Sequence, residues 1–171
     1  MYLNPIGQQR ATLMEIPSGE PGILQTLREM ARIAKQFKTD VRMRQLVAQL
    51  FRDANLAQGD FLGEVCVLHA FVRDTIRYMG DVHDVETLQD PNVTLQNESG
   101  DCDDKCILLA TLLECCNHPA RFMAVGMNGR GFSHVFVETW FKRCWIALET
   151  CRSVKAGWRP SNISSRMKMY I

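Results

Sequence analysis

A cysteine set among acidic residues opens the most apolar helical segment of the chain, SGDCDDKCILLATLLECC (99–116). Asp101 is a good N-cap residue and Asp104 stands three residues later, at the capping-box position, so Cys102 becomes the first helical residue. Backbone N–H groups at a helix N-terminus are unpaired and carry partial positive charge. They favour a thiolate and can hold the oxyanion that forms when a carbonyl is attacked. The pattern predicts Cys102 as a nucleophile and its backbone as part of an oxyanion hole.

The acidic neighbours of Cys102 act against this chemistry. Like charges raise the pKa of a thiol, so Asp101, Asp103 and Asp104 disfavour the thiolate. We expect these carboxylates to face outward, where solvent screens part of their effect. The helix terminus alone is then too weak to activate Cys102, and a cationic partner is required, most naturally a histidine. The alternative is that Asp101 and Asp104 are only structural caps and that Cys102 has no chemical role.

A histidine and a glutamate lie on two neighbouring segments that alternate as strands do. These segments are HVFVETWF (134–141) and CWIALET (144–150). If Lys142 and Arg143 form a two-residue turn, His134 and Glu149 become diagonal neighbours on one face, close enough to touch. A carboxylate bonded to one imidazole nitrogen fixes the tautomer and aims the other nitrogen, as a Cys/His pair needs. Lys-Arg is not a favoured hairpin turn, and a one-residue slip would move Glu149 to the opposite face.

These motifs resemble those of the transglutaminase-like superfamily, papain-like thiol enzymes with the sequence order Cys, His, Asp. The family's GDCxD motif corresponds to residues 100–104, its His strand to residues 134–138 and its final W-x-x-L strand to residues 145–149. The resemblance extends from residue 60 to about residue 160. It implies that Cys102 is the nucleophile, His134 the general base and acid, and Glu149 the orienting group. The family usually has Asp at this last position, and the longer Glu side chain can still accept the imidazole N–H.

The resemblance also implies an activity. We expect acyl transfer through a thioester to water or an amine, most simply as a cysteine peptidase or amidase and less readily as a transglutaminase. Tyr78 and Gln96 are candidates for the second oxyanion donor, and Asp101 and Asp104 are structural caps. The alternative is a non-catalytic structural or interaction protein that keeps the fold, because a fold does not fix a function.

The N-terminal helices and the segments 86–95 and 157–160 are similar to those of short transglutaminase-like proteins encoded by tailed phages and prophages. This closer resemblance implies a location in the cytoplasm of an infected bacterium or in a virion. The expected partners are a protein or peptide substrate and other virion proteins.

The helices and strands that must position these residues follow one another in the order typical of an α+β fold. Helical spacing of apolar residues predicts helices over residues 18–37, 39–51, 61–78 and 101–117. Alternation predicts strands over residues 121–127, 134–141 and 144–150. We expect residues 80–100 to be a surface loop and the chain after Trp158 to be loosely held. The predicted division is an N-terminal arm with helices (1–58), a papain/transglutaminase-like core of a central helix on an antiparallel sheet (59–160), and a tail (161–171).

The composition of the chain limits the partners and cofactors that we expect. The 171 residues carry a net charge of +1, which gives no electrostatic reason to expect nucleic acid or an anionic membrane. The N-terminus lacks the apolar core of a signal peptide, and no run is long enough to span a membrane. Seven cysteines, an odd number, suggest free thiols in a reducing compartment. Their spacings fit no zinc motif and no calcium loop is present, so we expect no metal and no cofactor.

Overall fold

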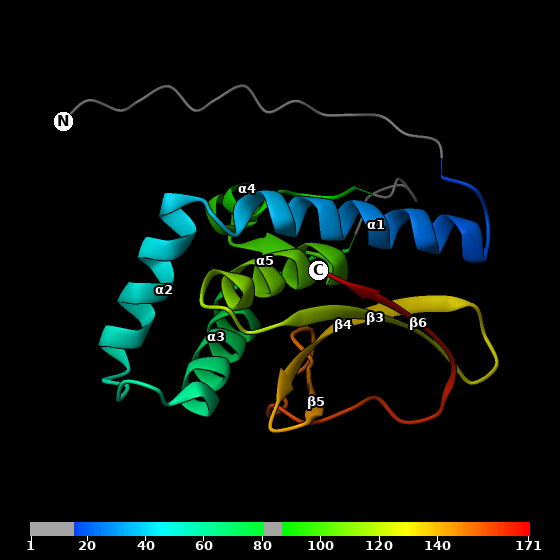
Figure 1. Cartoon of the computed structure of the whole chain (residues 1–171). Coiled ribbons are helices and arrows are strands. Elements are labelled where there is room, and N and C mark those ends of the chain that lie inside the picture. The colour runs from blue at the N-terminus through cyan, green and yellow to red at the C-terminus, as the bar shows by residue number, and fades with distance from the viewer. Residues whose placement is uncertain (1–15, 81–86) are drawn as a thin grey trace.

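The computed structural model describes residues 16–80 and 87–171. Helices and a sheet form two layers (Figure 1). The helices are α1 (Glu20–Phe37), α2 (Val41–Asp53), α3 (Phe61–Thr75), α4 (Pro91–Asn97) and α5 (Cys102–Cys115). The strands are β1 (Arg77–Tyr78), β2 (Ser99–Gly100), β3 (Ala120–Met127), β4 (Phe132–Phe141), β5 (Cys144–Leu148) and β6 (Ile163–Tyr170). The arrangement is the expected α+β fold.

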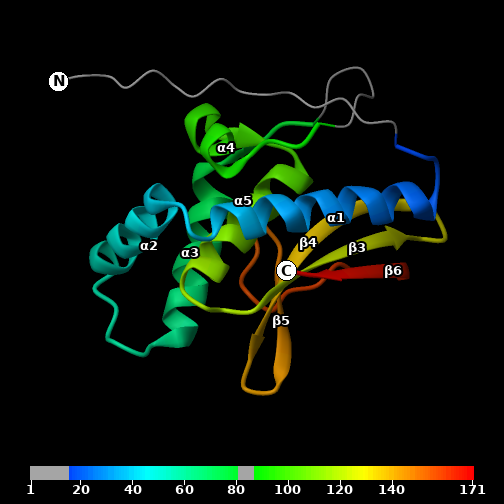
Figure 2. The same ribbon diagram turned by 45° about the horizontal axis from the view of Figure 1, so that its top comes forward.

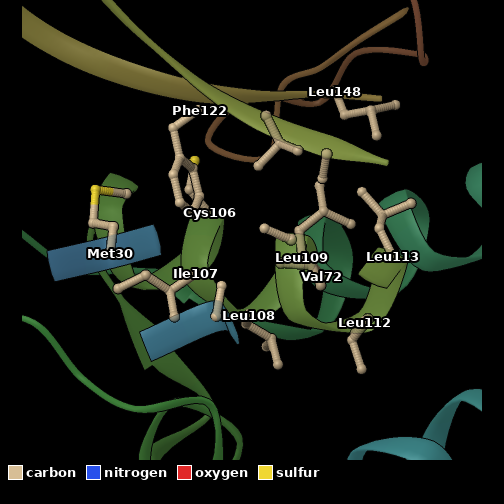
Figure 3. Close-up of a cluster of buried hydrophobic side chains, with 14 of the residues drawn as sticks. Met30, Val72, Cys106, Ile107, Leu108, Leu109, Leu112, Leu113, Phe122 and Leu148 are labelled. Atoms are coloured by element: carbon tan, nitrogen blue, oxygen red, sulfur yellow. The ribbon is translucent and has the colours of Figure 1, made fainter. Parts of the chain in front are cut away.

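Helix α5 is the centre of the molecule. It packs against the other four helices and against β3 and β4, and Figure 2 shows it enclosed by α1, α3 and the sheet. Because its apolar side chains surround the helix instead of forming one stripe, it must be buried on all sides. Figure 3 shows how α5 meets Met30 of α1, Val72 of α3 and Phe122 of β3 in this core. The N-terminus of α5, with Cys102, is thereby held in a fixed place.

Most helix ends predicted from capping residues and apolar spacing lie close to the observed ones. The Asp40 side chain accepts hydrogen bonds from the backbone of Arg42 (2.8 Å) and Met43 (3.4 Å), as expected for the cap of α2. The N-cap of α1 is Gly19, no side chain caps this helix, and it begins at Glu20, two residues after the predicted start at residue 18. Helix α3 ends at Thr75 and not at residue 78, because the chain turns extended at Ile76 and pairs as β1.

The sheet has the strand order β5-β4-β3-β6 and is antiparallel throughout. In the β4–β5 hairpin Phe141 pairs with Cys144, which confirms the register expected for a two-residue turn. Lys142 and Arg143 both have positive φ, 45° and 70°, as a two-residue hairpin turn of the favoured handedness requires. The alternation of apolar and polar residues, which a slip would invert, fixes this register despite the unsuitable turn residues.

Two expectations about irregular segments are wrong. The chain expected to be a loosely held tail forms β6, which pairs with β3 along its whole length. Its side chains alternate between half-buried and exposed, the pattern of an edge strand with one covered face. The expected surface loop before Cys102 contains α4, capped by the Asp90 side chain, and β2, which pairs with β1 in parallel. Residues 81–86 of that loop, like residues 1–15 of the expected arm, lie outside the described residues.

Lys105 on α5 is buried, with 2% of its surface exposed, at the C-terminal end of α3. Its ammonium donates hydrogen bonds to the backbone oxygens of Ile76 and, at 3.4 Å, Arg73. We expect Lys105→Met to lower the free energy of unfolding by roughly 1–3 kcal/mol, because these carbonyls lose a charged donor away from water. Urea denaturation measures the loss. The exposed Lys155→Met is the control and should stay within about 0.5 kcal/mol of wild type; equal losses in both variants would contradict this role for Lys105.

Candidate active site

The nucleophile candidate stands at a fully formed helix cap. The Asp101 side chain accepts hydrogen bonds from the backbone N–H groups of Asp103 (2.9 Å) and Asp104 (3.0 Å). The Asp104 side chain in turn accepts the backbone N–H of Asp101, so the capping box is confirmed. Gln89 was not recognised from the sequence. Its backbone and side-chain N–H groups hold both oxygens of Asp104, at 2.7 and 2.6 Å. The cap of α5 is therefore tied to the segment before α4.

The acidic residues do not all face outward, contrary to expectation. Asp103 and Asp104 are 8% and 2% exposed. The first turn of α5 is covered by neighbouring chain, so two of the three carboxylates are buried beside the half-buried Cys102. The Cys102 thiol donates to Asp103 Oδ1 at 3.5 Å.

These surroundings oppose a thiolate. Burial raises the pKa of the Cys102 thiol far above its ordinary value, and Asp103, Asp101 and the Cys151 thiol raise it further. A backbone hydrogen bond from Val135, the neighbour of His134 on β4, lowers this pKa in part. Cys102 is consequently a neutral thiol at neutral pH in the resting protein.

His134 and Glu149 meet as the hairpin register predicts. His134 Nε2 lies 2.6 Å from Glu149 Oε2, and the Glu149 side chain is fully buried. The other carboxylate oxygen accepts the Cys151 backbone N–H at 2.7 Å. Burial alone would raise the pKa of Glu149, but the hydrogen bond and charge of His134 and the Cys151 N–H outweigh burial and lower this pKa. Glu149 is an ionised acceptor that holds Nε2 and leaves Nδ1 as the second imidazole nitrogen.

A second histidine contacts the backbone of Glu149. His69 on α3 is 2% exposed, and its Nε2 lies 2.7 Å from the backbone oxygen of Glu149. Burial lowers the pKa of His69, so the ring is neutral and donates to that carbonyl. The sequence shows only an isolated histidine in a helix and gives no sign of this contact.

Cys102 and His134 line one cavity of about 180 Å³, which we call the nucleophile cavity. Its walls come from the start of α5, from the start of β4 and from Ile23, Leu27 and Met30 of α1. The expected pair is thus brought together, and α1 adds an apolar wall that the sequence did not associate with the site.

The two candidates for a second oxyanion donor differ. Tyr78 pairs with Gly100 in β1–β2, and the Cys102 thiol contributes to a raised Tyr78 pKa, after burial. Its strand partner Gly100 is two residues before Cys102, so β1 runs beside the segment that leads into α5. Gln96 is exposed on α4 and lines neither of the two cavities described here, so the structure gives it no place at the site.

A second cavity of about 310 Å³ lies between the end of α3, β1 and the chain that follows Glu149. We call it the basic cavity. It is lined by Arg73, Asp74, Thr75, Ile76, Arg77, Tyr78, Lys105, Thr150, Cys151, Arg152 and Ser153.

Glu64, Cys116 and His118 form the one group of possible metal ligands found among the described residues, with their ligand atoms within 4.8 Å of one another. Spacing along the sequence does not reveal this group, because Glu64 comes from the distant helix α3. His118 Nε2 already bonds Glu64 at 2.7 Å, and the Cys116 thiol donates to the backbone oxygens of Leu112 and Leu113 at 3.3 Å. The group lies at the end of α5 opposite Cys102 and is satisfied by its own hydrogen bonds.

Comparison with known proteins identifies the family of the chain. A family model described as the transglutaminase-like superfamily matches residues 48–150, more than half of the chain. The chain belongs to the transglutaminase-like superfamily. Membership in this superfamily, with Cys102 at the head of its central helix, supports a thiol enzyme. No curated protein matches the chain.

Two crystal structures share the transglutaminase-like fold of this chain. One is described as a candidate protease from Parabacteroides distasonis, with a TM-score of 0.57 and 13% identity over 72% of this chain and 26% of that chain. The other is described as a candidate cysteine protease from Cytophaga hutchinsonii, with a TM-score of 0.52 and 16% identity over 75% of this chain and 46% of that chain. The chain thus spans less than half the length of either protein, and at these identities the likeness shows the fold alone. Among the described residues, no helix has the length and apolarity needed to cross a bilayer.

Proposed function

We propose that the protein is a thiol acyl-transfer enzyme, a cysteine peptidase or amidase with Cys102 as nucleophile, His134 as base and acid, and Glu149 as the orienting group. The observation that carries the proposal is the 2.6 Å contact between His134 Nε2 and the buried Glu149, because His134 also lines the nucleophile cavity together with Cys102. A carboxylate, an imidazole and a thiol in this order are the parts of an activated nucleophile.

The protonated state of the thiol determines when its proton is transferred. Because the pKa of Cys102 is raised, the sulfur attacks the substrate carbonyl while its proton passes to His134 Nδ1. The S–C bond forms, the carbonyl oxygen becomes an oxyanion, and the C–N bond breaks as His134 returns the proton to the leaving amine. Water, deprotonated by His134, then cleaves the thioester and releases the acid and the thiol.

The helix start provides an oxyanion donor. Asp101 already holds the backbone N–H groups of Asp103 and Asp104, so the Cys102 N–H is the remaining amide of the first turn that can face a substrate oxygen. The positive end of the helix dipole adds to this interaction. Tyr78, whose strand partner Gly100 is two residues before Cys102, is the better candidate for a second donor than Gln96.

Acylation by p-nitrophenyl acetate tests the proposal. The exposed thiols Cys66 and Cys144 are first replaced by Ser, because they would react without activation. We expect a burst of p-nitrophenol and, by peptide mass mapping, an acetyl group on Cys102. His134→Ala should remove the burst. Acetylation of Cys102 at the same rate in His134→Ala, or acetylation spread equally over the other thiols, would contradict the proposal.

The second candidate is a non-catalytic structural or interaction protein of a phage particle that retains the fold. The observation that favours it is the buried and acidic setting of Cys102, whose thiol donates to Asp103 at rest. A phage or prophage origin, with the host cytoplasm or the virion as the location and virion proteins as partners, belongs to the same proposal and rests on the sequence resemblance. Absence of any acyl-enzyme in the experiment above would favour this candidate.

A further inference from the structure

We propose that the basic cavity binds a carboxylate of the substrate beside the reacting carbonyl. This inference rests on the proposed function, because it assigns the substrate class of that same site: amides or peptides that carry a negative charge close to the bond that is cleaved.

The basic cavity is built on the elements that carry the proposed catalytic groups. One wall is β1, where Tyr78 pairs with Gly100, two residues before Cys102. The opposite wall is the chain that follows Glu149, and the Cys151 backbone N–H in that wall donates to the Glu149 carboxylate. The cavity therefore shares its walls with the strand pair that leads to Cys102 and with the segment whose backbone N–H holds the Glu149 carboxylate.

The charges of the cavity lining do not cancel. Arg73 is held by Asp74, at 2.7 and 2.6 Å, and by the Val154 backbone oxygen at 2.7 Å, so this pair contributes little net charge. Three cationic side chains remain. These are Arg77, Lys105 and Arg152.

Two of these cations are available to a ligand. The guanidinium groups of Arg77 and Arg152 donate no hydrogen bond to another described residue. The charge of Arg152 helps to lower the pKa of Glu149, and its guanidinium lies 5.9 Å from the centre of the Trp158 ring. Lys105 uses its donors on two backbone oxygens at the end of α3. Lys105 therefore uses its donors to cap a helix, whereas the two arginines keep their guanidinium donors for a ligand.

A buried hydroxyl adds an independent sign of a ligand. Thr150 is 2% exposed and lines the cavity, and its Oγ1 has no hydrogen-bond partner among the described residues. The Cys151 sulfur lies near enough to interact weakly with this hydroxyl but not in hydrogen-bonding geometry. Buried hydroxyls are nearly always satisfied, so an acceptor supplied by a ligand is the natural partner. A carboxylate would accept from Thr150 and pair with the arginines.

The nucleophile cavity has the opposite charge. Its described lining includes Asp101 and Asp103 and no lysine or arginine. Cys102 lines the acidic cavity, and the basic cavity lies at the strand pair β1–β2 that leads to Cys102. A substrate with a carboxylate on one side of its amide would be attracted when that carboxylate enters the basic cavity and repelled when it enters the acidic one. The two cavities would therefore select one orientation of the bound substrate.

Calorimetric titration of Cys102→Ala, which cannot form an acyl-enzyme, tests the inference at low salt. The probes are acetyl-Ala-Glu-Ala-amide, with an acidic side chain, acetyl-Ala-Gln-Ala, with a free terminal carboxylate, and the neutral acetyl-Ala-Gln-Ala-amide. We expect at least one anionic probe to bind about tenfold more tightly than the neutral one, as two partly exposed ion pairs would provide. Whichever anionic probe binds identifies the side chain or the terminus as the source of the carboxylate.

Adding Arg77→Gln and Arg152→Gln together should abolish this preference, whereas Arg166→Gln, an exposed arginine of β6, should leave it unchanged. Equal affinity for all three probes, no binding of either anionic probe, or an equal loss with Arg166→Gln would overturn the inference. If the anionic probe binds through the arginines while wild type never forms an acyl-enzyme, the proposed function alone fails. If the acyl-enzyme forms without any preference for anionic probes, this inference alone fails.

Discussion

Glu149→Ala is expected to lower the rate of acylation of Cys102 by about 10²- to 10⁴-fold, the usual range for the loss of a group that controls general base catalysis. The buried carboxylate holds His134 Nε2 at 2.6 Å, and without it the imidazole loses both its fixed tautomer and its direction toward the thiol. The p-nitrophenyl acetate burst, followed in the background without Cys66 and Cys144, measures the rate.

A structural effect of Glu149→Ala must be separated from this positioning role, because Glu149 also accepts the Cys151 backbone N–H. If Glu149 acts through the imidazole, Glu149→Ala should have little further effect once His134 is replaced by Ala. Glu149→Asp, the residue usual in the family, shortens the arm by one methylene and should fall between wild type and Glu149→Ala. Fully additive losses in the double variant would contradict a role exerted through His134.

Glu138→Ala is expected to be the most destabilising single change, with a loss of about 3–5 kcal/mol in the free energy of unfolding. Glu138 lies in β4 with no exposed surface, between two arginines. Arg121 on β3 binds one carboxylate oxygen at 2.7 and 2.5 Å, and Arg159 binds the other. Removal of the carboxylate leaves the nearly buried Arg121 guanidinium without its countercharge, which is more costly than the loss of a surface ion pair.

Arg121 and Arg159 also connect the strands around Glu138. Arg121 lies 4.0 Å from the centre of the Trp145 ring on β5 and donates to the Tyr170 hydroxyl on β6, and Arg159 donates to the Trp145 backbone oxygen. Urea unfolding of Glu138→Ala measures the effect. Glu29→Ala breaks an exposed pair with Arg32 and serves as the control, with an expected loss below about 1 kcal/mol. A similar loss in the two variants would show that the buried cluster contributes no more than a surface pair.

The cap and the hairpin were predicted from the sequence because short-range rules govern them. Asp101 and Asp104 are three residues apart, and reciprocal bonds to the first turn of a helix are a local geometry. The register that joins His134 to Glu149 follows from alternation within one hairpin. The family motifs added the order of the elements, and the family match over residues 48–150 agrees with it.

Errors arose where a segment is stabilised by distant parts of the chain. The polar composition of residues 163–170 is that of a loose tail, yet an edge strand needs only one covered face, and β3 provides the partner. Helix α4 is too short to show a period in the sequence, and its Asp90 cap is stable only because the segment packs on α5.

The sequence by itself determined which residues can do chemistry: a thiol at a capped helix start and a histidine with a carboxylate on one hairpin face. Only the tertiary structure decided their surroundings, since burial depends on what packs over a residue and not on its neighbours along the chain. It buried Asp103 against the thiol, and burial and the Asp103 charge together raise the pKa of Cys102 far above its ordinary value. It also placed Arg77 and Arg152, which lie 75 positions apart in the sequence, around one cavity whose wall β1 pairs with the residues just before Cys102.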